Sequence, residues 1–192
     1  MTKFLTVLSF LFLLLAVSCK KEYTPKPRGY FRIEFPEKAY AKIDSAALPY
    51  RFEIPVYSKL VADKERLAEP YWTNLKFPRN KAEVHLSYKT VDNNLRELTE
   101  DARTLAYKHS VKADAINERV FINTKKKVYG TIYIIDGNAA SPLQFFLTDS
   151  TTHFLRGALY ISEVPNIDSI RPVIQFLTPD VIHLIETTEW TH

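Results

Sequence analysis

"LQFFLTDSTTHFLRGALYIS", residues 143–162, contains two apolar runs on either side of a polar turn. The runs LQFFLT and HFLRGALYIS are rich in aromatic and branched side chains, which favour β-strands. Between them stands Asp149-Ser150-Thr151-Thr152, whose side chains readily hydrogen-bond their own backbone and so favour a turn. The stretch therefore predicts an antiparallel hairpin, and with it an antiparallel sheet.

Other strands are predicted on both sides of this hairpin. Six further runs have the composition or the alternation of strands: residues 29–35, 50–57, 71–78, 81–89, 118–123 and 128–135. In the second of them Phe52, Ile54 and Val56 are expected to face the same side. Pro55 in that run indicates an edge strand or the end of a strand, because proline has no N–H for a sheet hydrogen bond.

Two regions have the period of a helix instead. Residues 93–109 carry apolar side chains every three or four positions and predict one central amphipathic helix. After the hairpin, Asp168 is expected to begin a helical segment, and Thr178-Pro179-Asp180 to start a second one with proline at its first position. This order predicts an α+β fold, an antiparallel β-sheet of about eight strands with one central helix and a C-terminal helical segment packed on it.

The N-terminus has the features of a lipoprotein signal peptide. Residues 4–17 form an apolar run of 14 residues, shorter than the roughly 20 that span a membrane. Small residues flank Val17 just before Cys19, although Leu15 lies four residues before the cysteine rather than the usual three. The sequence predicts cleavage before Cys19 and lipidation of its thiol. We expect a signal peptide (1–18), a lipidated tether (19–28) and a single α+β domain (29–192).

An alternative for this region is an ordinary signal peptide with a chance cysteine, or an uncleaved anchor. Cys19 is the only cysteine of the chain, so it has no second cysteine to pair with. This favours the lipid anchor and argues against a role for Cys19 as a nucleophile or metal ligand.

The basic charge of the chain is concentrated in the tether. Without residues 1–18 the chain has 25 basic and 22 acidic residues, a net charge of +3. Residues 20–32 contribute +4 of this, so the remaining domain carries −1. Basic residues beside a bilayer favour anionic lipids, whereas nucleic-acid binding requires a basic face on the domain itself. We expect a membrane partner through the lipid and no nucleic-acid partner.

Few residues suggest catalysis or cofactor binding. Only four glycines occur, so a glycine-rich phosphate loop cannot be built, and no cofactor is expected. No two of the five histidines stand four apart on a helix, which argues against a metal site. Ser150, His153 and Asp149 contain the residue types of a serine triad but are crowded into one turn. The lysine triplet 125–127 is interpreted as a solvated turn, and no catalytic residue is predicted.

Three segments together resemble the gliding-motility lipoprotein GldD family of Bacteroidota. They are KPRGYFRIEFPEKAY, YGTIYIIDGNAASPLQFFLTDSTTHFLRGALYIS and PNIDSIRPVIQFLTPDVIHLIE, and they follow in order along the mature chain. The resemblance implies an outer-membrane lipoprotein of the gliding machinery, linked to type IX secretion, with other envelope proteins as partners and without enzymatic activity. Cys19 is the one functional position that it carries over, as the lipidation site.

Two alternatives to a binding or scaffold role remain open. One is a lipid-anchored hydrolase of envelope material that uses His153 with Asp149 or Glu163. The other is a carrier of a small ligand, with aromatic side chains lining a cavity.

The partner-contact surface is expected within residues 137–156. Its candidate residues lie in two connections of this run and are Asn138, Ser141, Ser150 and His153. The alternative is that Gly137 serves only its turn and Gly157 only close packing.

Overall fold

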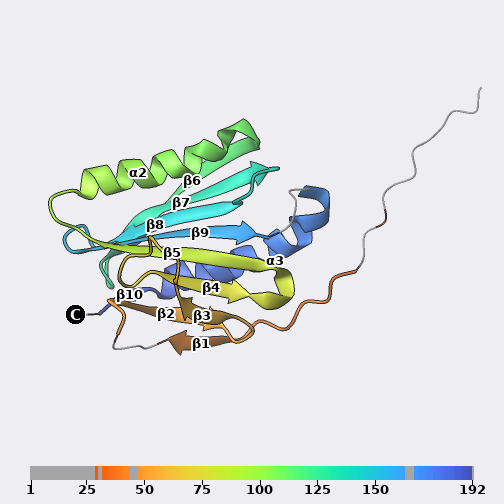
Figure 1. Cartoon of the computed structure of the whole chain (residues 1–192), viewed down its shortest axis with the longest axis horizontal. Coiled ribbons are helices and arrows are strands. Elements are labelled where there is room, and N and C mark those ends of the chain that lie inside the picture. The colour runs from red at the N-terminus through yellow and green to blue at the C-terminus, as the bar shows by residue number, and fades with distance from the viewer. Residues whose placement is uncertain (1–28, 30–31, 44–46, 163–166, 192) are drawn as a thin grey trace, which may run out of the picture. The chain divides into compact units, whose positions relative to one another are not determined.

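The hairpin of residues 143–162 lies in the middle of the main sheet. In the computed structural model β8 (Leu143–Thr148) and β9 (His153–Ile161) pair antiparallel, and β5 (Ala82–Thr90) pairs along the other edge of β9. The seven strands are arranged in the order β3-β4-β5-β9-β8-β7-β6 (Figure 1). The other four are β3 (Lys59–Ala62), β4 (Thr73–Phe77), β6 (Ala113–Asn123) and β7 (Val128–Gly137). The α+β fold with an antiparallel sheet is confirmed.

The structure describes residues 29, 32–43, 47–162 and 167–191. The predicted signal peptide, the lipidation site Cys19 and the tether 19–28 lie outside the described residues, as does Glu163. From Ile33 onward the chain forms one compact unit.

A second, smaller sheet joins distant parts of the chain. It consists of β1 (Tyr40–Ile43), β2 (Tyr50–Pro55) and β10 (Glu189–Trp190), with β2 in the middle and both neighbours antiparallel to it. The strand end predicted at Pro55 is confirmed.

One face of the main sheet is covered by the C-terminal helix α3 (Ile167–Thr187) together with β2. Phe52 of β2, Phe145 of β8, Leu159 of β9 and Leu177 of α3 belong to the same core cluster and are almost completely buried. Removing this apolar surface from water supplies the main stabilisation of the fold.

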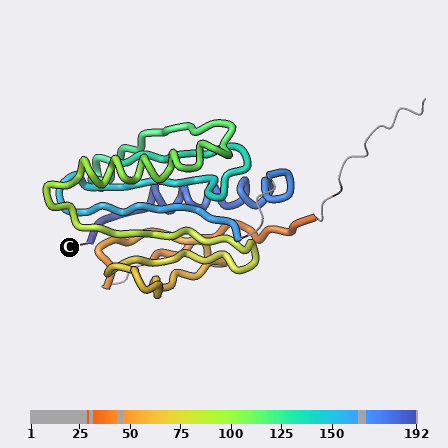
Figure 2. The backbone as a smooth tube through the Cα atoms, turned by 45° about the horizontal axis from the view of Figure 1, so that its top comes forward, coloured from red at the N-terminus to blue at the C-terminus, as the bar shows by residue number. Residues whose placement is uncertain are grey.

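The central helix α2 (Leu95–Tyr107) covers the opposite face. Its Leu98, Ala102 and Ala106 are buried against a cluster that includes Phe146 and Phe154. Figure 2 shows α2 in front of the strands and α3 behind them. Because both faces are covered, all six residues of β8 are buried, which explains why LQFFLT is a nearly continuous apolar run.

Short 3-10 helices occupy Pro78–Asn80 (η1) and Lys108–Val111 (η2).

Two glycines have clear structural reasons. A Cβ on Gly157 would lie 2.2 Å from the ring of Phe145, so only glycine lets this ring pack over β9. Gly137 has a φ of +98°, a conformation that other residues rarely adopt. Close packing at Gly157 and a turn conformation at Gly137 are therefore both present.

Several predicted elements differ from the structure. Described residues 32–35 of the first predicted strand form no strand. Val56 is 61% exposed, because β2 ends at Pro55 and Val56 lies in the following turn. The predicted restart of a helix at Pro179 is wrong, because α3 continues through it. Pro179 is exposed, so water can solvate the carbonyl group that loses its N–H partner.

Candidate functional site

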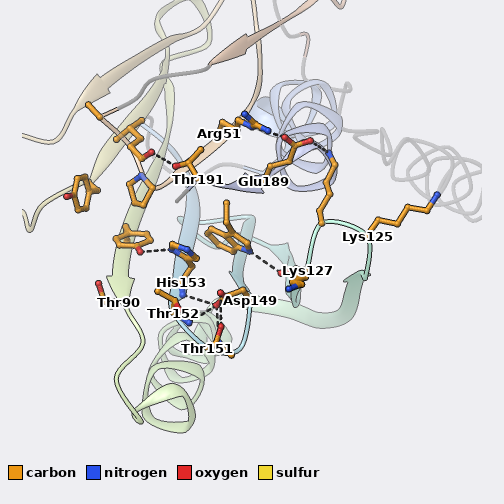
Figure 3. Close-up of a pocket in the computed structure, with 17 residues that line it drawn as sticks. Arg51, Thr90, Lys125, Lys127, Asp149, Thr151, Thr152, His153, Glu189 and Thr191 are labelled. Carbon is orange, nitrogen blue, oxygen red and sulfur yellow. Dashed lines mark hydrogen bonds and ion pairs between the residues drawn. The ribbon is translucent and has the colours of Figure 1, made fainter.

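An open cavity of about 1040 Å³ lies at the tip of the β8–β9 hairpin. It is lined by the hairpin turn, the β6–β7 turn, the strands β2, β5 and β10, and the loops that precede β2 and β4 (Figure 3). These parts are far apart in the sequence, and the two sheets bring them together. The cavity contains Asp149 and His153, two of the residues that the sequence analysis considered.

The hairpin turn is organised by the carboxylate of Asp149. Its Oδ1 accepts hydrogen bonds from the backbone N–H groups of Thr151, Thr152 and His153, at 2.8 to 3.0 Å. Its Oδ2 accepts the hydroxyl of Thr151 at 2.9 Å. Burial alone would raise the pKa of Asp149, but these hydrogen bonds outweigh it and lower the pKa to about 2. The carboxylate therefore fixes the turn and remains ionised.

Aromatic rings form one wall of the cavity. The Tyr88 hydroxyl and Nδ1 of His153 lie 2.7 Å apart and share a hydrogen bond. The His153 ring stacks on Trp190, with ring centres 5.0 Å apart, and Tyr71 meets Tyr88 edge to face. The indole of Trp190 donates to the carbonyl of Lys127 at 3.1 Å. Burial raises the pKa of Tyr88, so its hydroxyl stays protonated at neutral pH.

Charged residues form the other side. Glu189 lies 2.7 Å from Nε of Arg51 and 3.1 Å from Nζ of Lys126, and these two partners lower its pKa, Lys126 most. No ion pair joins Lys125 or Lys127 to a carboxylate within the described ranges. Figure 3 shows Lys125 extending outward at the rim. With four cationic side chains against two carboxylates, the lining has a formal charge of +2.

The four predicted contact residues do not form one surface. Ser150 and His153 lie at the hairpin tip, where Ser150 is exposed and His153 half-buried. Asn138 is exposed but lies at the opposite end of β8. Ser141 is completely buried and its hydroxyl faces the carbonyl of Leu143, so its assignment as a contact residue is corrected. Six residues of extended strand, roughly 20 Å, separate the two connections.

The arrangement does not bring a serine triad together. Both oxygens of Asp149 bind the turn, while the described partner of the His153 ring nitrogen Nδ1 is Tyr88. An orienting carboxylate would have to bind the histidine ring instead. Among the described residues, no group of three His, Cys, Asp or Glu side chains is placed to hold a metal ion.

Most of the cavity lining has no signal in the sequence. Arg51, Tyr88, Glu189 and Trp190 carry no local signal, because each becomes part of the site only through tertiary structure. The lysine triplet 125–127, predicted as a solvated turn, is a turn whose three lysines also line the cavity.

A comparison with models of protein families assigns the chain to one of them. The model of the family described as gliding motility lipoprotein GldD matches residues 20–190. The chain belongs to the GldD family. It is therefore a lipoprotein of the cell envelope and a component of gliding motility. No curated protein sequence matches the chain.

A solved structure has a similar fold. Cyanobacterial PsbP (CyanoP) from Synechocystis sp., determined in solution, aligns with a TM-score of 0.50 and 10% sequence identity. The alignment covers 81% of this chain and 95% of CyanoP. At this identity the similarity concerns the fold alone. Within the part of this GldD-family chain that the structure describes, no helix has the length and apolar character needed to cross a membrane.

Proposed function

We propose that the chain is a non-enzymatic binding or scaffold component of the gliding machinery, held in the outer membrane by lipid on Cys19 and linked to type IX secretion. The observation that carries this proposal is the family match, which covers residues 20–190. The proposed partners are other proteins of the envelope.

The cavity supports a binding role. It is open, it combines aromatic rings with uncompensated cations, and its hairpin turn is held by Asp149. Exposed connections on a rigid sheet are common places for binding residues. The hydrolase alternative has weaker support, because the described hydrogen bonds of Asp149 orient the turn and not the histidine ring.

The anchor is tested by Cys19→Ser in cells that carry no other copy. We expect an uncleaved or soluble form, loss from the outer-membrane fraction, and loss of gliding. The same cells are assayed for secretion of a type IX substrate. A Cys19→Ser protein that still fractionates fully with outer membranes and supports gliding would show that the lipid anchor is not needed.

The binding role is tested by crosslinking intact cells and identifying proteins captured with the wild-type chain. Envelope proteins of the gliding or secretion machinery are expected. His153→Asn distinguishes the hydrolase alternative from the binding role, because it removes the imidazole that catalysis would need but keeps a polar side chain of similar shape. If this variant is folded and keeps its crosslinked partners but cells cannot glide, the site acts in catalysis and the proposal is wrong.

A further inference from the structure

We propose that the cavity at the hairpin tip binds an acidic, extended segment of a partner protein. This inference rests on the proposed binding function and names the chemistry of the partner. Three properties of the cavity support it: its positive charge, the two carboxylates that already have partners within the domain, and an unpaired strand edge at β10.

The cavity is a local concentration of positive charge on a slightly acidic domain. Residues 33–192 carry 20 basic and 21 acidic side chains, a net charge of −1. The cavity lining, in contrast, has four cations and two carboxylates. A basic cavity on such a domain is complementary in charge to an acidic segment of a partner.

The two carboxylates are already occupied within the domain. Asp149 accepts three backbone N–H groups and one hydroxyl, and Glu189 is shared by Arg51 and Lys126. Neither needs a cation from a ligand. The charge that remains for a ligand comes from Lys125 and Lys127, for which the described residues provide no carboxylate.

The strand β10 supplies backbone groups suited to a polypeptide. Among the described residues β10 pairs with β2 alone, in the order β1-β2-β10, and the N–H of Thr191 donates to the carbonyl of Pro49 at 3.0 Å. Hydrogen-bonded and non-hydrogen-bonded pairs alternate along antiparallel strands. The N–H and C=O of Trp190, one residue before, therefore point to the unpaired edge, and the described residues offer neither a hydrogen-bond partner.

These features together fit an acidic peptide better than a phosphate ion or a lipid head group. An extended peptide can use one strand edge for backbone hydrogen bonds and place alternate side chains toward cations. The aromatic wall of Tyr71, Tyr88 and Trp190 contacts its apolar parts. At about 1040 Å³ the open cavity also exceeds what one phosphate group fills.

The test measures peptide binding to the full-length lipidated protein in detergent micelles by fluorescence anisotropy. The probe is a labelled peptide of about 12 residues with Glu at alternate positions, and its counterpart has Gln at the same positions. We expect binding of the Glu peptide, weaker binding at high salt, and at least tenfold weaker binding of the Gln peptide.

Matched variants locate the binding site. Lys125→Glu with Lys127→Glu should weaken binding of the Glu peptide by about tenfold or more, which is 1.4 kcal/mol. The control is Lys59→Glu with Lys112→Glu, which makes the same change of charge at two exposed lysines outside the cavity. The control should change affinity by no more than about twofold.

Several outcomes would overturn the proposal. One is equal binding of the Glu and Gln peptides, and another is an equal loss in the control variant. Unlabelled Glu peptide, inorganic phosphate and glycerol phosphate are each added as competitors of the labelled peptide. If either phosphate compound displaces it at the same concentration as the unlabelled peptide does, the cavity binds a small anion or a lipid head group. A change of oligomeric state in the cavity variant would assign it to a second copy of the chain.

Cell experiments distinguish this inference from the proposed function. If the Glu peptide does not bind but cells with Lys125→Glu and Lys127→Glu lose gliding and crosslinked partners, the acidic peptide is wrong and the binding function stands. If the peptide binds but no envelope protein is captured in cells, the proposed function fails instead.

Discussion

The ammonium group of Lys38 lies 2.7 Å from Oδ1 of Asp180, whose side chain is completely buried. The hydroxyls of Tyr40 and Tyr57 donate to the same carboxylate, at 2.9 and 2.6 Å. A buried charge is costly unless it is paired and hydrogen-bonded, and Asp180 has both kinds of partner. Lys38 precedes β1 while Asp180 lies in α3, so the contact fastens the start of the domain to its last helix.

Aromatic packing reinforces this contact around Phe176. Nζ of Lys38 lies 3.5 Å from the centre of the Phe176 ring and donates to the Phe176 carbonyl at 2.6 Å. The ring of Phe35 stacks on Phe176 at 4.3 Å. Described residues of two of the three segments that carry the family resemblance therefore meet here. The contact holds residues 35–38 against α3.

Asp180→Asn is expected to destabilise the domain by about 1–3 kcal/mol, because an amide cannot accept from the Lys38 ammonium and from both tyrosine hydroxyls as the carboxylate does. The charge of Lys38 itself is not left buried, since its side chain is about one-third exposed. Urea unfolding measures the change. The control is Asp168→Asn on the same helix, where the side chain is 66% exposed and the expected change is within about 0.5 kcal/mol. Equal effects of the two variants would contradict a stabilising role of the cluster.

Stability should also fall at high pH because of the tyrosines at Asp180. Burial, and then the hydrogen bond to Asp180, raises the pKa of Tyr40 from 10.0 to about 12, and the pKa of Tyr57 is raised for the same reasons. A raised folded pKa gives stability that is present below pH 10 and lost as pH rises toward 12. Tyr40→Phe with Tyr57→Phe should flatten the stability curve between these pH values. An unchanged slope in the double variant would rule out these two groups.

Most of the main sheet could be predicted because its pairings are local, the pairing of β5 with β9 being the exception. β8 and β9 are joined by one turn whose Asp149 forms the expected hydrogen bonds with the backbone, and their alternation is visible in the sequence. The smaller sheet could not be predicted in the same way. β10 has only two residues, and it pairs Glu189 with Arg51, which is 138 positions away. A segment this short has no periodicity of its own.

The same distinction applies to the cavity. Asp149 and His153 could be placed together because one turn holds both. Trp190 contacts His153 because α3 leads the chain back to β2, where β10 pairs. Lys126, in the turn of the main sheet between β6 and β7, contacts Glu189 in the smaller sheet. Because Ser141 lies among small residues in a connection, the sequence predicts that it is exposed. It is completely buried, and such burial depends on the tertiary structure.

Asp149 should make the hairpin turn sensitive to acid. Its pKa of about 2 lies below the ordinary value of 3.8, so its stabilisation is present above pH 3.8 and is lost as pH falls toward 2. Asp149→Asn should cost about 1–2 kcal/mol at pH 7, because it removes the charge that accepts the turn's N–H groups. The difference from the wild type should shrink as the pH falls toward 2. A difference that does not depend on pH would show that the charge of Asp149 contributes nothing.

Gly157→Ala should destabilise the core by about 1–3 kcal/mol, because the new methyl group would overlap the ring of Phe145. The Phe145 side chain is almost completely buried in the core. Phe145→Leu removes the overlapping ring atoms but also leaves a cavity, so it should destabilise on its own. Combined with Gly157→Ala it should cost less than the sum of the two single changes, and urea unfolding of all four proteins measures this difference. Additive costs would contradict an overlap with the Phe145 ring as the reason for glycine at this position.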